Sequence, residues 1–231
     1  MAPFRIDDEN SVRFENNGDY NQIVDWIKLE TTEGVIAPNE THTIKFTIDV
    51  PEDTPAGGQY ATIVTRTKKD PSVDNSMNIQ NVFEISHLIY GDVAGETIRK
   101  GNISDVSVSS FLMSGKITGN AMIENIGNVH ADASQVMQVF PLFSNEEAFT
   151  NEENPKNALI MPGQKRATSL SWDETPSIGI FHVIYKVNFE GVESKVDKMV
   201  IVCPLWLLFL IILAIFLLIF RLLSAKKKDK K

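Results

Sequence analysis

In residues 41–50, THTIKFTIDV, polar and apolar side chains alternate from Thr43 to Val50. The apolar side chains are Ile44, Phe46, Ile48 and Val50. Because successive side chains of a strand point to opposite faces, this pattern predicts a strand with one face buried. A turn containing Pro and Asn precedes it and a loop rich in Pro and Gly follows it, as expected for strand boundaries. The segment therefore favours a β-fold.

The same period of two continues along most of the chain. Residues 68–77 are polar and predict a loop, and the two glycines of residues 91–96 predict a hinge because the strand pattern stops there and then restarts. Short strands about ten residues apart are typical of an all-β sandwich. Further strands are expected at residues 59–67, 82–90, 103–108, 116–124, 131–140, 159–161, 165–172, 179–189 and 192–202.

The two halves resemble each other in the order of their patterns. In each half a Pro-containing turn (residues 37–40 and 161–164) leads into a strand, and a Gly-x-aromatic strand follows. We therefore predict two tandem immunoglobulin-like β-sandwiches, at residues 1–91 and 92–202.

Residues 205–220, LWLLFLIILAIFLLIF, form an unbroken apolar run. About twenty helical residues, each rising roughly 1.5 Å, cover the roughly 30 Å hydrocarbon core of a bilayer. A helix buried in a soluble core would show a polar stripe, and this run has none. We therefore predict a transmembrane helix at residues 203–223. Pro204 suits its first turn and Trp206 suits the outer interface.

Basic residues follow the apolar run and predict its orientation. Six Lys and Arg side chains lie in residues 221–231, whereas the near flank on the other side offers only Lys195 and Lys198. Because cytoplasmic flanks carry the excess of Lys and Arg, residues 224–231 should be a cytoplasmic tail and residues 1 to about 200 should lie outside. The predicted anchoring residues are Pro204, Leu205, Trp206, Phe220, Arg221, Lys226, Lys227 and Lys228.

The rest of the chain is acidic. Residues 1–220 carry 16 basic and 29 acidic side chains, a formal net charge of −13. This charge disfavours nucleic acid as a partner. Cys203 is the single cysteine, so no disulfide within the chain is possible. Residues 1–10 lack the basic and apolar regions of a signal peptide, so we expect either that the true start lies upstream or that the anchor alone directs insertion.

Several phrases resemble bacterial cell-surface proteins related to the WxL-interacting family. They lie at residues 24–29, 37–40, 50–60, 124–130, 161–166 and 172. That family has tandem immunoglobulin-like domains, an N-terminal signal peptide and a C-terminal membrane helix with a basic tail. The resemblance implies an N-terminally truncated first sandwich. It also implies adhesion or scaffolding at the envelope, with peptidoglycan or a surface protein as partner.

No pattern typical of catalysis occurs. The chain lacks a phosphate-binding loop, a nucleophile elbow and a His-Glu-x-x-His zinc motif. The acidic clusters at residues 7–10 and 145–154 lack the ligand spacing of a calcium loop and are interpreted as solvated loops. Trp26 and Trp172 are expected in sandwich cores. We predict no enzyme activity, no cofactor, no metal and no small-molecule substrate.

Two hypotheses remain open at this point. The first is a single-pass envelope protein whose sandwiches bind a partner through loops or unpaired strand edges. The second is a tail-anchored sandwich that faces the cytoplasm and recruits peptides, in the manner of major-sperm-protein domains. The missing signal peptide favours the second hypothesis, and the charge asymmetry around residues 205–220 favours the first.

Overall fold

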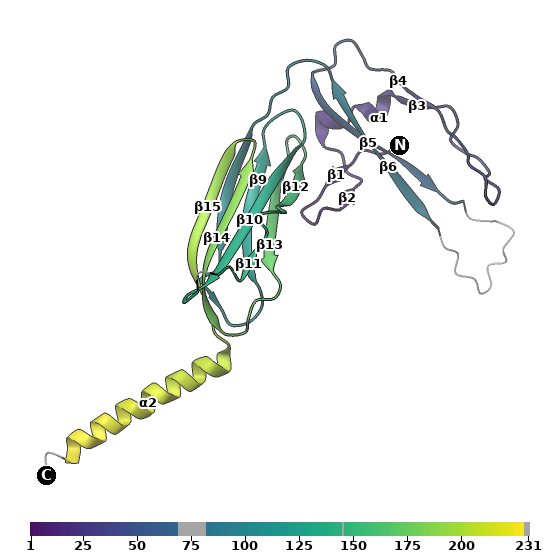
Figure 1. The fold of residues 1–231 in the computed structure, drawn as a ribbon. Coiled ribbons are helices and arrows are strands. Elements are labelled where there is room, and N and C mark those ends of the chain that lie inside the picture. The colour runs from purple at the N-terminus through teal and green to yellow at the C-terminus, as the bar shows by residue number, and fades with distance from the viewer. Residues whose placement is uncertain (69–81, 145, 229–231) are drawn as a thin grey trace. The chain divides into compact units, whose positions relative to one another are not determined.

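The computed structural model describes residues 1–68, 82–144 and 146–228, and for residues 222–228 it describes the backbone alone. The predicted polar loop at residues 68–77 lies outside the described residues except for Lys68. The described chain is mostly β-structure with one long C-terminal helix (Figure 1). It divides into two compact units, which are described separately below.

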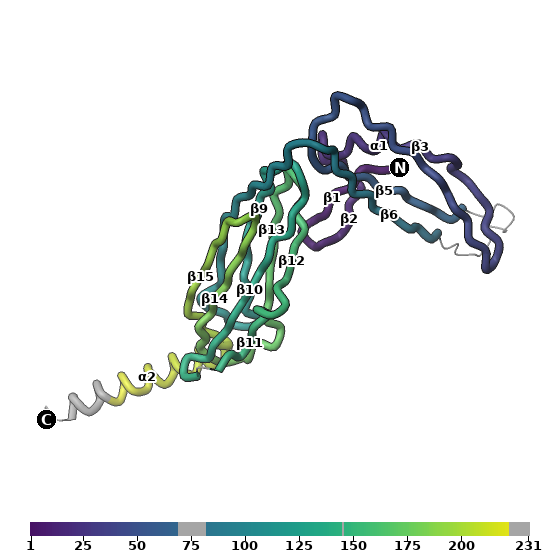
Figure 2. Tube along the Cα trace, turned by 45° about the horizontal axis from the view of Figure 1, so that its top comes forward, coloured from purple at the N-terminus to yellow at the C-terminus, as the bar shows by residue number. Residues whose placement is uncertain are grey.

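Unit 2 comprises residues 103–123, 133–158 and 167–231. A six-stranded sheet has the order β11-β10-β14-β15-β8, with β12 also paired to β10, and a three-stranded sheet has the order β13-β9-β7. Figure 2 shows these long strands running side by side. The elements are β7 (Gly101–Val108), β8 (Phe111–Leu112), β9 (Ile117–Asn125), β10 (Ala131–Pro141), β11 (Phe149–Thr150), β12 (Lys156–Ile160), β13 (Lys165–Trp172), β14 (Gly179–Phe189), β15 (Val192–Val202) and α2 (Leu205–Lys228).

The strands of unit 2 follow the alternation in their sequences. Every second residue of β9, from Ile117 to Asn125, is buried, and the same holds for β14 from Phe181 to Phe189. One face of each strand therefore packs into a core between two sheets, as the period of two predicts. The predicted strands in this half of the chain are confirmed, with boundaries shifted by three residues at most.

Close contacts show that the two sheets pack face to face. Trp172 on β13 meets Phe181 on β14 edge to face, with ring centroids 5.5 Å apart. A Cβ atom at Gly119 on β9 would lie 2.7 Å from the ring of Tyr185 on β14. Glycine is therefore required at position 119, because the tyrosine ring occupies the space that a side chain would need. Unit 2 is a β-sandwich.

Unit 1 comprises residues 1–102, 124–132 and 159–166. Its strands form three separate two-stranded ribbons, β1-β2, β3-β4 and β5-β6, each antiparallel (Figure 1). A four-residue 3₁₀ turn and a four-residue helix precede β3. The elements are β1 (Arg5–Ile6), β2 (Val12–Arg13), η1 (Gly18–Asn21), α1 (Ile23–Trp26), β3 (Ile27–Leu29), β4 (Phe46–Ile48), β5 (Gly57–Arg66) and β6 (Glu84–Val93).

The buried face predicted for residues 41–50 is wrong. Only Phe46–Ile48 form a strand, and Ile44, Phe46, Ile48 and Val50 are all exposed, by 39% to 49%. The physical reason is that β4 pairs with β3 alone and the ribbon is covered only in part: Ile27 of β3 is buried with Trp26 and Ala61, whereas all three residues of β4 are exposed. The period of two therefore marks a strand here, but the apolar side chains of that strand are not buried.

The predicted boundary between the halves stays a prediction. Residues 91–96, expected as a hinge, contribute Gly91 to Val93 to the end of β6, and the first segment of unit 1 continues to Asn102. Two segments from the second half of the sequence, residues 124–132 and 159–166, are also part of unit 1.

A helix forms where the sequence predicts one, from Leu205 to Lys228 rather than over residues 203–223. A search of the described residues finds no helix whose length and hydropathy suffice to cross a membrane.

Candidate functional site

The predicted anchoring residues lie at the end of unit 2. Pro204 precedes α2, and its carbonyl accepts hydrogen bonds from Leu207 and Leu208, at 3.0 and 3.1 Å. Leu205, Trp206 and Phe220 lie on α2 and are at least 60% exposed. Arg221 is exposed, and Lys226, Lys227 and Lys228 lie in the last turn of α2, where only the backbone is described.

The β5-β6 ribbon of unit 1 leaves one edge of β6 unpaired among the described strands. Strand β6 pairs with β5 over all ten of its residues and with no other described strand. Phe83 and Ile85, at its start, are exposed by 66% and 60%. An unpaired edge presents free backbone N–H and C=O groups, to which an extended polypeptide can add a strand.

A buried tyrosine holds β5 to residues 124–132. The hydroxyl oxygen of Tyr60 accepts a hydrogen bond from the backbone N–H of His130 at 2.9 Å, and it lies 3.1 Å from the ring Nδ1 of the same histidine. The ring of Tyr60 packs edge to face against Phe4 and Tyr90. Burial raises the pKa of Tyr60 to about 12, because the phenolate would lose its hydration.

The turn at residues 125–128 supplies further hydrogen bonds within unit 1. Asn125 is buried, and its side-chain amide donates to the carbonyls of Val129 and Ile160, at 2.8 and 3.0 Å. Its Oδ1 accepts from the N–H of Gly127 at 2.9 Å. The first asparagine of this turn thus satisfies three backbone groups that would otherwise be unpaired in the interior.

Asn128 ties the same turn to β5. Its Nδ2 donates to the carbonyl of Ala56 at 3.0 Å, and its own carbonyl accepts from the N–H of Gly58 at 2.8 Å. A Cβ atom at Gly57 would lie 2.6 Å from this carbonyl, and Gly57 has φ of 132°. The predicted Pro- and Gly-rich loop therefore ends in a glycine that both the backbone conformation and the close approach require.

The turn at residues 161–166 secures the N-terminal ribbon. The side-chain amide of Gln164 donates to the carbonyl of Ile6, and the guanidinium of Arg166 donates to the side-chain oxygen of Asn10. Arg166 is 1% exposed, and burial lowers its pKa while the nearby carboxylates of Asp7 and Asp8 act in the opposite direction. The sequence indicated a turn here but not these partners, which lie more than 150 residues away.

The acidic cluster at residues 7–10 builds a turn. Asp7 Oδ1 accepts hydrogen bonds from the N–H groups of Glu9 and Ser11, at 2.9 and 2.8 Å, and Oδ2 pairs with Arg13 at 2.6 Å. These bonds hold the pKa of Asp7 below its usual range. Among the described residues no group of three metal-binding side chains occurs, and residue 145 of the second acidic cluster lies outside them.

Both tryptophans predicted in the core are buried. Trp26 is 8% exposed in unit 1 and Trp172 is 6% exposed in unit 2. Trp172 stacks against Phe149 at 6.0 Å between ring centroids, in addition to its contact with Phe181. Neither tryptophan therefore presents an exposed aromatic face on which a sugar could stack.

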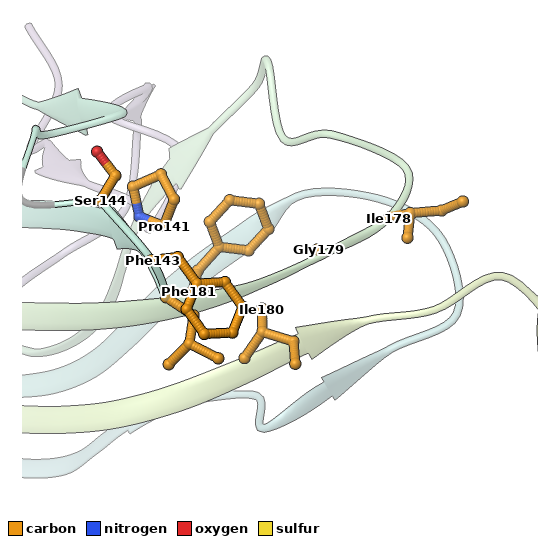
Figure 3. A pocket seen from close by; sticks show the side chains of 8 residues that line it. Pro141, Phe143, Ser144, Ile178, Gly179, Ile180 and Phe181 are labelled. Atoms are coloured by element: carbon orange, nitrogen blue, oxygen red, sulfur yellow. The ribbon is translucent and has the colours of Figure 1, made fainter.

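A shallow apolar hollow of about 550 Å³ lies at one end of unit 2 (Figure 3). It is formed where β10 ends and β14 begins. Its walls come from residues 141–144 and 178–181, and Phe143 and Ile180 are among the exposed side chains there. Sequence analysis missed this hollow, although the adjacent apolar residues Leu142 and Phe143 at the end of a strand were a usable signal.

No family model matches the chain, and a search among curated proteins finds no match. Among solved structures, a β-glucosidase from Listeria innocua in complex with glucose is similar over 48% of this chain and 17% of its own, with 9% identity and a TM-score of 0.35. A crystal structure of β-glucosidase from the same organism is similar over 60% of this chain and 20% of its own, with 11% identity and a TM-score of 0.33. The chain thus spans about a fifth of these enzymes, and similarity at this level assigns it no function.

Proposed function

We propose that this chain is a single-pass membrane protein, with two immunoglobulin-like β units outside the cell, a helix at residues 203–223 in the bilayer and a basic tail in the cytoplasm. Its role is adhesion or scaffolding at the envelope through binding of a surface protein or peptidoglycan, and not catalysis. The resemblance to proteins related to the WxL-interacting family supports the same role.

The observation that carries the proposal is the exposure of α2. Its apolar side chains from Phe209 to Phe220, apart from the small Ala214, are all 41% to 66% exposed. A contiguous exposed apolar surface of this extent in water marks a site of contact with membrane or protein. The sequence of residues 205–220 contains no polar stripe that would turn toward water, which favours lipid on all sides.

Extraction of membranes tests this placement. Membranes from cells that make the protein are washed with alkaline carbonate, which releases peripheral proteins and leaves spanning proteins in the pellet. The proposal predicts that the full chain stays in the pellet together with a known integral protein. Complete release with the peripheral proteins would overturn it.

The open edge of β6 supports strand addition as the mode of partner binding. Its ten residues leave one edge unpaired among the described strands, and Phe83 and Ile85 offer apolar side chains beside it. In strand addition the backbone bonds supply affinity and the alternate side chains supply specificity. We therefore expect the partner to be a surface protein that contributes an extended segment, whose backbone pairs with the open edge of β6.

Photo-crosslinking tests the edge. A photoreactive amino acid placed at Ile85 should give a covalent adduct to a second protein in intact cells, whereas the same amino acid at Val192 on unit 2, also exposed, should give none. Adducts of equal yield from both positions would show non-specific capture. Binding to purified peptidoglycan that is unchanged by Ile85→Lys would place the partner site elsewhere.

A further inference from the structure

The outer face of the larger sheet of unit 2 changes character along its length. Ile180 on β14 stands opposite Ile201 on β15, which stands opposite Phe111 on β8. The N–H of Leu142, at the end of β10, donates to the carbonyl of Ile180 at 2.9 Å. Because directly opposed residues of neighbouring strands share a face, these four side chains form one apolar row across four strands.

All four members of this row are exposed, by 40% to 43%. Beyond its end the chain adds Phe143, which is 96% exposed, and Ile178, which is 49% exposed. We call these six residues the apolar rim: Phe111, Leu142, Phe143, Ile178, Ile180 and Ile201. Figure 3 labels Phe143, Ile178 and Ile180 of this rim at the hollow.

Further along the same face the side chains become charged. From Ile201 back toward the start of β15, every second residue lies on this face: Met199, Asp197 and Lys195. The carboxylate of Asp197 pairs with His182 and Lys195. These hydrogen bonds lower the pKa of Asp197. The exposed apolar side chains, Met199 included, thus gather toward one end of the face, and farther along it ion pairs lie among the half-buried side chains of Val136 and Ile184.

The apolar end is the end from which α2 emerges. Val202 ends β15, the N–H of Cys203 still donates to the carbonyl of Leu112 at 2.8 Å, and the helix begins at Leu205. A chain spans at most about 3.6 Å per residue, so Ile201 lies within about 14 Å of the first helical residue in any direction of the helix. No free linker separates the sandwich from the helix.

We propose that the apolar rim inserts into the headgroup region of the outer leaflet, so that unit 2 stands on the membrane surface. The proposal rests on the proposed function, because it requires α2 in the bilayer. The interfacial layer on each side of the hydrocarbon core is several ångströms thick, so it can receive the rim side chains that lie nearest the start of the helix. Exposed Phe, Leu and Ile side chains are those that interfacial segments bury there.

The charged side chains near the apolar rim indicate which lipids the rim can contact. Lys116 pairs with Asp173 at 2.8 Å, and Glu147 accepts a hydrogen bond from Gln138 at 2.9 Å, so neither pair offers an unpaired positive charge to anionic lipid. Contact with lipid at this rim is therefore hydrophobic and not electrostatic. It should occur with zwitterionic lipid and should not weaken in high salt.

The experiment places a spin label on the full chain in vesicles of phosphatidylcholine. The label is attached at Phe143→Cys in a Cys203→Ser background, and a matched control carries it at Val192→Cys, at the opposite end of β15. Collision rates with oxygen, which concentrates in lipid, and with a water-soluble nickel complex are compared. Both positions are exposed, so both variants are expected to fold.

The expected result is an oxygen-to-nickel ratio at position 143 several-fold above that at position 192, unchanged in high salt. A water-like ratio at position 143 in protein that resists carbonate extraction would overturn this inference and leave the proposed function intact. A label at position 143 shielded from both reagents would show a protein occupant, such as a second copy, and would also overturn it. Release of the chain by carbonate would overturn both.

Discussion

The hydroxyl of Tyr60 accepts a hydrogen bond from the backbone N–H of His130, 70 residues further along the chain. Tyr60 is fully buried and contributes its ring to a cluster with Phe4, Tyr90 and His130. A single side chain thus links the β5-β6 ribbon, which offers the open edge, to residues 124–132 of unit 1. The hydrogen bond adds to the packing of β5, whose Tyr60 and Ala61 lie in two buried apolar clusters of unit 1.

Removing this hydroxyl should loosen unit 1. Tyr60→Phe leaves the N–H of His130 without its acceptor, and an unpaired buried group of this kind costs about 1–3 kcal/mol. We expect faster hydrogen exchange of the β5 amides, measured by mass spectrometry of peptides, and unchanged exchange in β14. The matched control is Tyr90→Phe, which removes a hydroxyl from the same cluster that makes no hydrogen bond among the described residues. Equal acceleration in both variants would contradict the role of the Tyr60 bond.

Ionisation of Tyr60 should also lower the stability of unit 1 at alkaline pH. Its folded pKa of about 12 lies above the unfolded value of 10.0, so its contribution to stability is complete below pH 10 and is lost as the pH rises from 10 to 12. The urea midpoint of unfolding should fall across this range. In Tyr60→Phe the midpoint should fall less, because the phenol with the raised pKa is absent. Identical pH slopes for the two proteins would refute the prediction.

Gly119 should be indispensable for packing unit 2. Gly119→Ala places a methyl group 2.7 Å from the Tyr185 ring, and overpacking of this kind costs about 1–3 kcal/mol. The thermal unfolding temperature of unit 2 should drop. The control Asn120→Ala adds no atom to the core, since the neighbouring residue is exposed, and should leave the temperature nearly unchanged. If the two variants behave alike, the predicted contact between the sheets is not formed.

Asn125 should contribute more to the folding stability than its position in a turn indicates. Asn125→Ala removes both donors and the acceptor that serve Val129, Ile160 and Gly127, at a cost of about 1–3 kcal/mol. We expect a lower denaturant midpoint, whereas Asn157→Ala, at an exposed position on β12, should keep the midpoint of the natural protein. A normal midpoint for Asn125→Ala would mean that water replaces the amide at no cost.

The sequence predicted the strands of unit 2 well because each has one buried face. Alternation from Ile117 to Asn125 and from Phe181 to Phe189 reports a core directly. The same alternation at residues 44–50 misled, because periodicity shows that a strand can bury a face and not that a partner covers it. Phe111 and Leu112 pair with β15 in parallel. A strand of two residues is too short to show a period in the sequence.

The candidate surfaces were predicted only in part. The apolar run at residues 205–220 was plain from composition, since it needs no tertiary information. The hydrogen bonds of Gln164 and Arg166 to Ile6 and Asn10 join residues about 150 positions apart, and no local pattern encodes such a pairing. The apolar rim likewise depends on strand register, which brings Phe111, Ile180 and Ile201 into one row.

Protease treatment of intact cells that make the protein tests the central proposal most directly. With the two β units outside, added protease should cut within residues 1–200, while α2 with the basic tail stays with the cell and a cytoplasmic marker stays whole. Protection of residues 1–200 under conditions that cut a known surface protein would contradict the proposal. That result would favour a helix-anchored module that faces the cytoplasm.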